Sequence, residues 1–284
     1  MNDIVFSETL HNGYGQLLSV DRLIYRQKTD HQDLIIFENQ VFGRVLTLDG
    51  VVQTTEGDEY VYHEMMTHVP MMAHGAVRKV LIIGGGDGGM ARECLRHESL
   101  LALTMVEIDQ SVVDLCKTYL PAISDGAFDD PRLNLVIADG ARFVAESDDK
   151  YDLIIVDSTD PIGPGEILFG RAFYRDCVSR LAAGGVIVTQ NGVPFVQGDE
   201  VTLTYRRLGD EVNDMWFYVA PVPTYQGGHM AFGWGSDNPA LRQQDAATIA
   251  ARFSATGIAC RYYTPEVHVA AFALPADILK LLAD

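Results

Sequence analysis

The chain has 284 residues, which is enough for one large domain or two unequal ones. It carries 39 acidic against 21 basic residues, a formal net charge of −18 at pH 7, and this argues against nucleic acid or an anionic membrane as partner because both select basic surfaces. The same charge would attract a cationic small molecule, although acidity also serves solubility alone.

The sequence predicts a soluble cytoplasmic protein. Residues 1–8 include acidic side chains and no long apolar run, so they do not resemble a signal peptide, and no 18 consecutive residues are apolar. The cysteines are far apart and lack metal-ligand spacing, which favours buried thiols in a reducing compartment; they are Cys94, Cys116, Cys177 and Cys260. We expect no metal site.

The N-terminal part is expected to be a small β domain over residues 1–57. Short β-branched runs separated by turn signals predict strands over residues 17–25, 34–38, 44–48 and 51–55. So few strands need a partner, which we expect to be the larger domain or a second subunit. A helix over residues 58–68, leading into Pro70, opens the second domain, residues 58–284.

From Lys79 onward strands and helices alternate, which is typical of a parallel sheet with crossover helices. Strands are predicted over residues 80–83, 102–108, 133–138, 153–156 and 186–190, and helices over 89–96, 111–119, 140–146, 171–181 and 199–211. Residues 229–234 and 267–274 are expected to close the sheet as a late pair. The fold class is therefore α/β, a Rossmann-like, methyltransferase-type sheet that is mostly parallel with antiparallel last strands.

A glycine-rich loop, Gly84–Gly89, follows the first predicted strand of that sheet. Glycines let a ligand approach the backbone, and the next helix offers free N–H groups. The spacing also fits a dinucleotide fingerprint, which is weak evidence without context. Glu107 ends the second strand and could accept both ribose hydroxyls of NAD or of an adenosyl sulfonium. Asp139, after the third strand, could accept from an adenine amino group or simply cap a helix.

Asp87 helps to choose between these ligands. A carboxylate inside the glycine loop would repel a pyrophosphate and would also repel the carboxylate of ordinary adenosylmethionine. It would favour a cationic tail, so the sequence indicates an adenosyl ligand whose tail is an amine.

A second pair of carboxylates follows the apolar run of residues 153–156. Asp157 and Asp160 stand three apart where a predicted buried strand meets a loop rich in proline and glycine. Ligands bind at strand ends in open α/β sheets, although aspartates in such a loop can also be turn formers.

Several longer motifs then occur in one order along nearly the whole chain. They are residues 29–34, 48–56, 62–65, 84–89, 106–109, 157–169 and 223–225. In these motifs the chain resembles the spermidine synthase family of polyamine aminopropyltransferases, and in particular its bacterial branch. The resemblance implies transfer of an aminopropyl group from decarboxylated S-adenosylmethionine, a co-substrate, to putrescine, giving spermidine and methylthioadenosine. It also implies a homodimer or homotetramer, and no permanently bound cofactor.

The resemblance assigns roles to residues that match the family's motifs. Those implied to contact the nucleoside are Gln32, Glu107, Asp139, Gly140 and Pro164. Asp87 would bind the amine of the aminopropyl group, and it is counted among both the donor-binding and the substrate-binding residues. The residues implied to face the polyamine are Tyr62, His63, Asp157, Asp160 and Tyr225, with Asp157 as proton acceptor. Many relatives carry Gln where this chain has His63, and a small polar residue where it has Ile167.

The chemistry needs an unprotonated amine in line with the S–CH₂ bond, since a sulfonium already leaves well. With a pKa of about 10.4, only about one amine in 10³ is free at pH 7. A carboxylate is a weak base toward an ammonium, so we expect Asp157 both to orient the nitrogen and to receive its proton. A diamine N-methyltransferase, an NAD-dependent oxidoreductase and a non-catalytic polyamine-binding protein remain alternatives. Among acceptors, cadaverine, agmatine and spermidine stay open beside putrescine.

Overall fold

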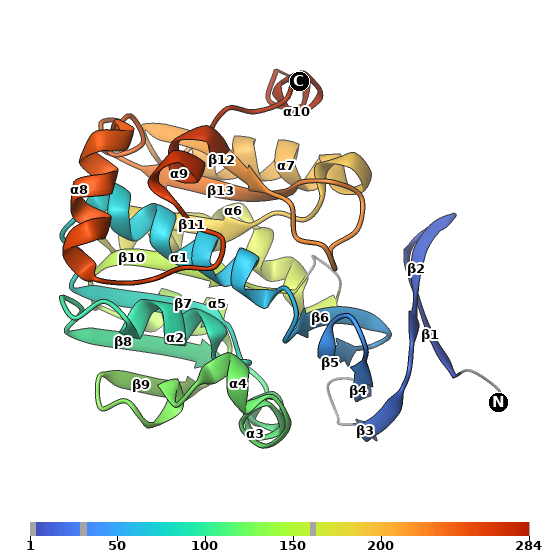
Figure 1. Ribbon diagram of the computed structural model, residues 1–284. Coiled ribbons are helices and arrows are strands. Elements are labelled where there is room, and N and C mark those ends of the chain that lie inside the picture. The colour runs from blue at the N-terminus through green and yellow to red at the C-terminus, as the bar shows by residue number, and fades with distance from the viewer. Residues whose placement is uncertain (1–3, 29–32, 160–162, 284) are drawn as a thin grey trace.

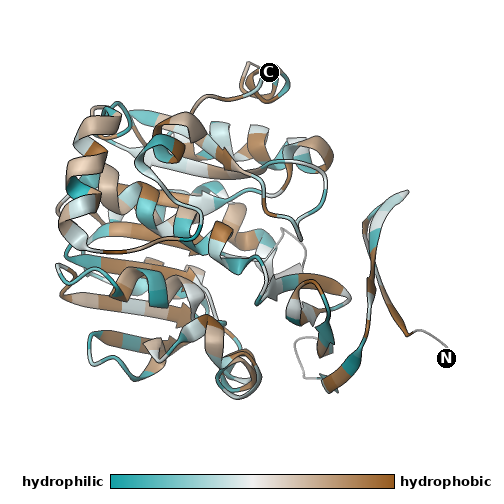
Figure 2. Ribbon diagram, viewed as in Figure 1, coloured by the Kyte–Doolittle hydropathy of each residue, from teal (hydrophilic) through white to brown (hydrophobic). Residues whose placement is uncertain are grey.

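The computed structural model describes residues 4–28, 33–159 and 163–283. Its N-terminal region begins with a two-stranded hairpin of β1 (Val5–His11) and β2 (Tyr14–Ser19), which extends away from the body of the molecule (Figure 1). A four-stranded antiparallel sheet follows, of β3 (Arg22–Lys28), β4 (Asp33–Asn39), β5 (Gly43–Leu48) and β6 (Val51–Thr55). The hairpin exposes apolar side chains, among them Leu17. In Figure 2 its ribbon carries hydrophobic as well as hydrophilic colours.

One strand predicted in this region, residues 17–25, is wrong. The chain leaves the hairpin at Ser19 and joins the second sheet at Arg22, because the N–H of Val20 bonds to the carbonyl of Ile4 while that of Asp21 bonds to Glu38. Strand β1 was not predicted.

The second region is built on a seven-stranded sheet in the order β12-β13-β11-β10-β7-β8-β9 (Figure 1). Its parallel strands are β7 (Lys79–Gly84), β8 (Ala102–Glu107), β9 (Leu133–Ile137), β10 (Tyr151–Asp157) and β11 (Leu181–Gln190). Antiparallel to β11 lies β13 (Met230–Ser236), which pairs with β12 (Asp214–Ala220). The predicted α/β, Rossmann-like architecture with antiparallel last strands is confirmed.

The helices cover both faces of this sheet. They are α1 (Glu59–His74), α2 (Gly89–Leu95), α3 (Gln110–Tyr119), α4 (Pro121–Ser124), α5 (Gly140–Glu146), α6 (Arg171–Ser179), α7 (Pro194–Gly209), α8 (Ala246–Thr256), α9 (Pro265–Ala271) and α10 (Ala276–Leu281), with 3₁₀ turns η1 (Ala127–Asp129) and η2 (Gly163–Phe169). Because strand side chains alternate, Val80 and Ile82 pack with α1 and α2, whereas Leu81 and Ile83 pack with α5 and α6.

Three local predictions are wrong. Residues 267–274 do not form a strand: the Thr264 side chain accepts from the N–H of Val267 and Pro265 occupies the first turn, which starts α9. Strand β12 takes that place in the sheet. Helix α1 continues past Pro70 to His74, because nearly all of its side chains are buried in the core and this packing outweighs the missing hydrogen bond.

The third wrong prediction concerns the end of the helix predicted over residues 171–181. Helix α6 instead ends at Ser179, and β11 begins at Leu181, which pairs with Tyr151 before a bulge. Gly184, with φ of 73°, lies within that bulge. Across the described residues, no helix is long and apolar enough to cross a membrane.

Candidate active site

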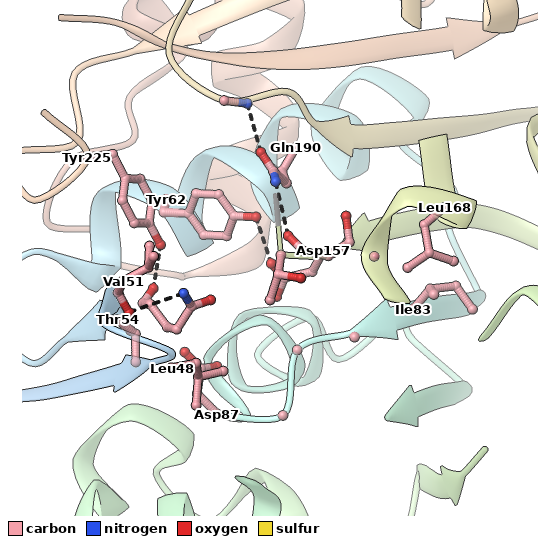
Figure 3. A pocket seen from close by; sticks show the side chains of 18 of the residues that line it. Leu48, Val51, Thr54, Tyr62, Ile83, Asp87, Asp157, Leu168, Gln190 and Tyr225 are labelled. Atoms are coloured by element: carbon pink, nitrogen blue, oxygen red, sulfur yellow. Dashed lines mark hydrogen bonds between the residues drawn. The ribbon is translucent and has the colours of Figure 1, made fainter. Parts of the chain in front are cut away.

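A cavity of about 1210 Å³ opens at the carboxyl edge of the parallel strands (Figure 3). One wall comes from the segments that follow β7, β8, β9 and β10. The opposite wall comes from β1, β5, β6, the start of α1 and residues 224–226. The cavity is therefore shared between the N-terminal strands and the large sheet.

The glycine loop forms part of the cavity wall, and its first residue, Gly84, packs against the backbone of Asp157. Gly84 and Gly85 have positive φ values of 90° and 77°, which favour glycine. A Cβ on Gly84 would lie 1.9 Å from the Asp157 carbonyl oxygen, so no larger residue fits there. Asp87, in the loop after β7, and Asp157, at the end of β10, therefore both line the cavity.

Glu107 lies where β8 ends and lines the cavity. Its carboxylate accepts from the N–H of Asp109 at 3.0 Å. Burial raises the pKa of Glu107 to about 7, against the lowering effect of the backbone donors. A Cβ on Gly86 would lie 2.8 Å from Glu107 Oε2, so Gly86 leaves room for this carboxylate beside the loop.

Asp139 and Gly140 line the same side, just after β9. The Asp139 carboxylate accepts from the N–H of Arg142 at 3.0 Å and caps α5, so the capping role is present beside exposure to the cavity. Gly140 packs on Ile83, where a Cβ would lie 2.5 Å from a methyl group.

Three residues of the predicted site cannot be placed in this way. Gln32 and Asp160 lie outside the described residues, and so does the side chain of Pro164, whose backbone belongs to η2.

Asp157 ends β10 and faces the cavity beside Tyr62 (Figure 3). The Tyr62 hydroxyl donates to Asp157 Oδ1 at 2.6 Å. Burial, and then the charge of Asp87, raises the pKa of Asp157 to about 6, while His63 and the Tyr62 hydrogen bond act in the opposite direction. Near neutral pH this carboxylate is ionised, yet it is a stronger proton acceptor than an exposed aspartate.

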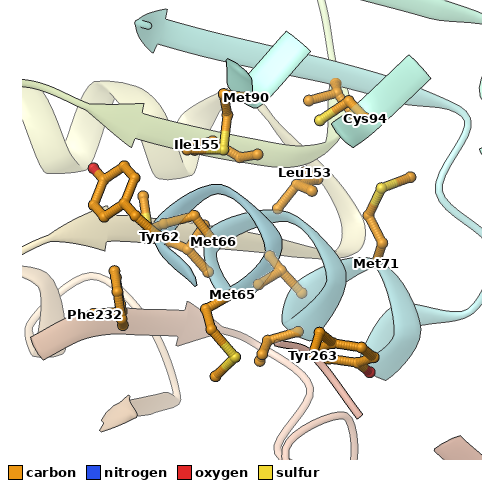
Figure 4. Close-up of a cluster of buried hydrophobic side chains, with 14 of the residues drawn as sticks. Tyr62, Met65, Met66, Met71, Met90, Cys94, Leu153, Ile155, Phe232 and Tyr263 are labelled. Carbon is orange, nitrogen blue, oxygen red and sulfur yellow. The ribbon is translucent and has the colours of Figure 1, made fainter. Parts of the chain in front are cut away.

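Two tyrosines form an aromatic wall. The rings of Tyr62 and Tyr225 are 5.8 Å apart and nearly perpendicular, at 86°. Tyr62 also packs against Phe232, 5.7 Å away, within the buried cluster of Figure 4. The Tyr225 hydroxyl donates to the carbonyl of Gln53 at 2.5 Å, which joins this wall to β6.

His63 was predicted to face the polyamine, but its side chain is buried behind Asp87 rather than among the residues that line the cavity. Its Nε2 is 3.5 Å from Asp87 Oδ2, and its Nδ1 is 2.5 Å from Glu59 Oε2. Burial alone would lower the pKa of His63, but Asp87 and Glu59 raise it to about 9. The ring is therefore an imidazolium between two carboxylates.

Sequence reasoning missed several polar residues of the cavity, of which Glu8 and Gln190 are examples. Glu8 comes from β1 and accepts from the N–H of Val52 at 2.7 Å; no motif marked it, because its strand was not predicted. Gln190 ends β11, and its Nε2 donates to the carbonyl of Ser158 at 3.1 Å. Its position at the end of a predicted strand was a usable signal.

The sheet order and the carboxylate-lined cavity at its strand ends place the protein among Rossmann-like α/β proteins. A spermidine synthase tetramerisation domain model matches residues 4–56, and a spermine/spermidine synthase domain model matches residues 59–245. The chain belongs to the spermidine synthase family of polyamine aminopropyltransferases.

Individual relatives are similar to this chain over nearly its full length. The polyamine aminopropyltransferase of Erwinia tasmaniensis is 59% identical over 277 residues, covering 98% of this chain and 97% of the relative. That of Pectobacterium carotovorum is 58% identical over 278 residues, with the same shares covered.

Two solved structures share the fold. A spermidine synthase in complex with the transition-state analogue AdoDATO superposes with a TM-score of 0.94 at 38% identity, covering 100% of this chain and 96% of the other. Spermidine synthase from Thermotoga maritima gives 0.91 at 36% identity, covering 100% and 95%.

Proposed function

We propose that the protein transfers the aminopropyl group of decarboxylated S-adenosylmethionine to putrescine and releases spermidine and methylthioadenosine. The observation that carries this proposal is the pair Asp87 and Asp157 facing one cavity beside the nucleoside-side carboxylate Glu107. A solved relative named for its complex with the analogue AdoDATO supports the same donor class.

The donor would lie along the carboxyl edge of the sheet. Glu107 would accept from the ribose hydroxyls, and Asp139 with Gly140 would border the adenine. Gln32 and Pro164 stay predictions for this end. Asp87 would pair with the ammonium of the aminopropyl tail, which disfavours ordinary adenosylmethionine because that molecule adds a carboxylate at this end.

The diamine would lie along the Tyr62 and Tyr225 rings, whose faces attract cations. One nitrogen would approach Asp157; Asp160 stays a predicted contact. The amine nitrogen attacks the carbon bonded to sulfur, so that the N–C bond forms as the C–S bond breaks. The electron pair of the C–S bond passes to sulfur, which leaves as a neutral thioether. The proton that the nitrogen loses passes to Asp157. Since its pKa is raised to about 6, Asp157 receives this proton more readily than an ordinary carboxylate.

The matched tetramerisation model and the apolar side chains exposed on β1 and β2 support assembly as a homodimer or homotetramer. We place the enzyme in the cytoplasm, with no nucleic acid or membrane partner. Among the described residues there is no group of three His, Cys, Asp or Glu side chains arranged to bind a metal ion, and the reaction as proposed needs neither a metal nor a permanent cofactor.

The test is product identification by mass spectrometry after mixing pure protein with decarboxylated adenosylmethionine and putrescine. Spermidine and methylthioadenosine in equal amounts are expected, and Asp157→Asn serves as the negative control. Methylated diamine from ordinary adenosylmethionine would contradict the proposal, and parallel assays with cadaverine, agmatine and spermidine would define the acceptor range.

A further inference from the structure

Behind Asp87 a row of buried ionic groups runs away from the cavity. His63 Nδ1 is 2.5 Å from Glu59 Oε2, and Glu59 receives both terminal nitrogens of Arg92, at 3.0 and 2.9 Å. The exposed fractions of the three side chains are 3%, 7% and 14%. None of these three residues lines the cavity.

The row is rigid because each side chain is fixed more than once. Glu59 and His63 are four residues apart on α1, so they lie on one helix face. Arg92, on α2, binds Glu59 with its planar fork and also donates to Glu93 and to the carbonyl of Ile123, at 2.8 and 2.6 Å.

The backbone is adapted to the His63 ring. A Cβ on Gly89 would lie 2.3 Å from His63 Cε1, so the ring occupies space that only glycine leaves free. The N–H of that same Gly89 donates to Asp87 Oδ1 at 2.8 Å, while His63 Nε2 faces Asp87 Oδ2. Asp87 is thus restrained at both oxygens.

Positive and negative groups alternate along the row. The ionisable groups that act on His63 are Glu59 from its own helix, Asp87 from the glycine loop and Asp157 from β10. Burial would raise the pKa of Glu59, but His63 and Arg92 outweigh it and lower that pKa below its ordinary value. His63 and Arg92 thereby keep Glu59 ionised, and Asp87 together with Glu59 keeps His63 protonated.

We propose that Glu59 and Arg92 are positioning residues, which fix His63 as an imidazolium against Asp87 and so orient the carboxylate that receives the donor's ammonium. This inference rests on the proposed function only for the identity of the donor. It assigns the row an effect on donor binding, and none on the diamine, whose aromatic wall lies elsewhere.

The first test is a ¹⁵N NMR titration of the histidine side chains, with the His63 signal assigned through His63→Gln. In the wild type His63 should titrate near pH 9. In Glu59→Gln its midpoint should fall by about one pH unit or more, because a partner charge is lost. Arg92→Gln removes a positive charge and leaves the Glu59 carboxylate in place, so there the midpoint should not fall. The matched control is Arg96→Gln, at the C-terminal end of α2. Arg96 pairs with Glu93 at 2.6 Å and does not contact Glu59.

The second test is steady-state kinetics on the same variants. We expect KM for the donor to rise about tenfold in Glu59→Gln and Arg92→Gln, with partial rescue in Arg92→Lys because the charge returns without the fork. KM for the diamine, and both constants in Arg96→Gln, should stay within about twofold of wild type.

A wild-type His63 midpoint at or below its ordinary value would overturn the inference, even if a variant fails to fold. So would an unchanged midpoint in folded Glu59→Gln, or an equal rise in donor KM in Arg96→Gln. If the titrations behave as expected but the protein turns over no adenosyl sulfonium, the positioning of His63 stands and the proposed function fails.

Discussion

The two ends of the cavity are built in different ways. At the end that we propose binds the nucleoside, called the nucleoside end here, each carboxylate is restrained by the backbone close to it in sequence: Glu107 by the N–H of Asp109 and Asp139 by the N–H of Arg142. At the end that we propose binds the amines, called the amine end here, the contacts join distant segments, as from Tyr62 to Asp157, 95 residues apart, and from Tyr225 to Gln53, 172 apart.

This difference has a functional meaning. The nucleoside end follows from the strand–loop–helix units themselves, so any chain with this sheet could form it. The amine end requires the N-terminal strands, α1 and residues 224–226 to pack together, and it is there that carboxylates and aromatic rings face one another. We therefore assign binding of the common adenosyl group to the first end and the reaction and its specificity to the second.

Loss of the carboxylate at Asp157 should have the largest effect at the amine end. Asp157→Asn keeps the shape and the Tyr62 contact but removes the proton acceptor, so kcat should fall by about 10³-fold. Stopped assays at saturating donor and diamine measure it, with thermal unfolding as the control for structure. Near-normal turnover would show that Asp157 only binds substrate.

At the nucleoside end the expected loss is in binding. Glu107→Gln removes the carboxylate that we propose accepts from the ribose hydroxyls, which should cost about 2 kcal/mol or ~30-fold in affinity for methylthioadenosine. Isothermal titration calorimetry measures that affinity, and KM for putrescine should change little. A loss confined to the diamine would contradict the division between the two ends.

The pH dependence of the rate also reports on the amine end. With the pKa of Asp157 at about 6 in the free protein, its ionised and active form decreases as pH falls through that value. The ratio kcat/KM for putrescine should therefore be about tenfold lower at pH 5 than at pH 7, after correction for the protonation of the diamine. If this acidic limb persists in Asp157→Asn, it belongs to another group.

Tyr225 should give the smallest effect. Tyr225→Phe keeps the aromatic wall but breaks the hydrogen bond to Gln53, worth about 1 kcal/mol. KM for putrescine should rise about fivefold with donor binding unchanged. A larger effect on methylthioadenosine binding would show that the two ends are coupled through β6.

The same contrast explains what the sequence could predict. Residues placed at strand ends, such as Glu107 and Asp157, were found because an apolar run leads directly to each. Glu8 was missed because β1 was not predicted, and its approach to the cavity is a tertiary contact. His63 was predicted to face the polyamine, whereas its location behind Asp87 depends on how α1 and α2 pack.

The fold, too, could be predicted only where the sequence signal is local. The βα alternation fixed the parallel core, since each unit is local. The partner of β13 was assigned to residues 267–274 instead of Asp214–Ala220, because an edge strand and a short helix carry similar apolar runs until capping by Thr264 is considered.

The most direct measurement of the central claim compares the affinities of decarboxylated and ordinary adenosylmethionine for the wild type and for Asp87→Asn. If the amine end selects a cationic tail, the wild type should bind the decarboxylated donor about 30-fold or more tightly than the ordinary one. In Asp87→Asn that preference should shrink to a few-fold, because the charge that repels the carboxylate is gone. Equal affinities in the wild type, or a preference unchanged by Asp87→Asn, would contradict the account.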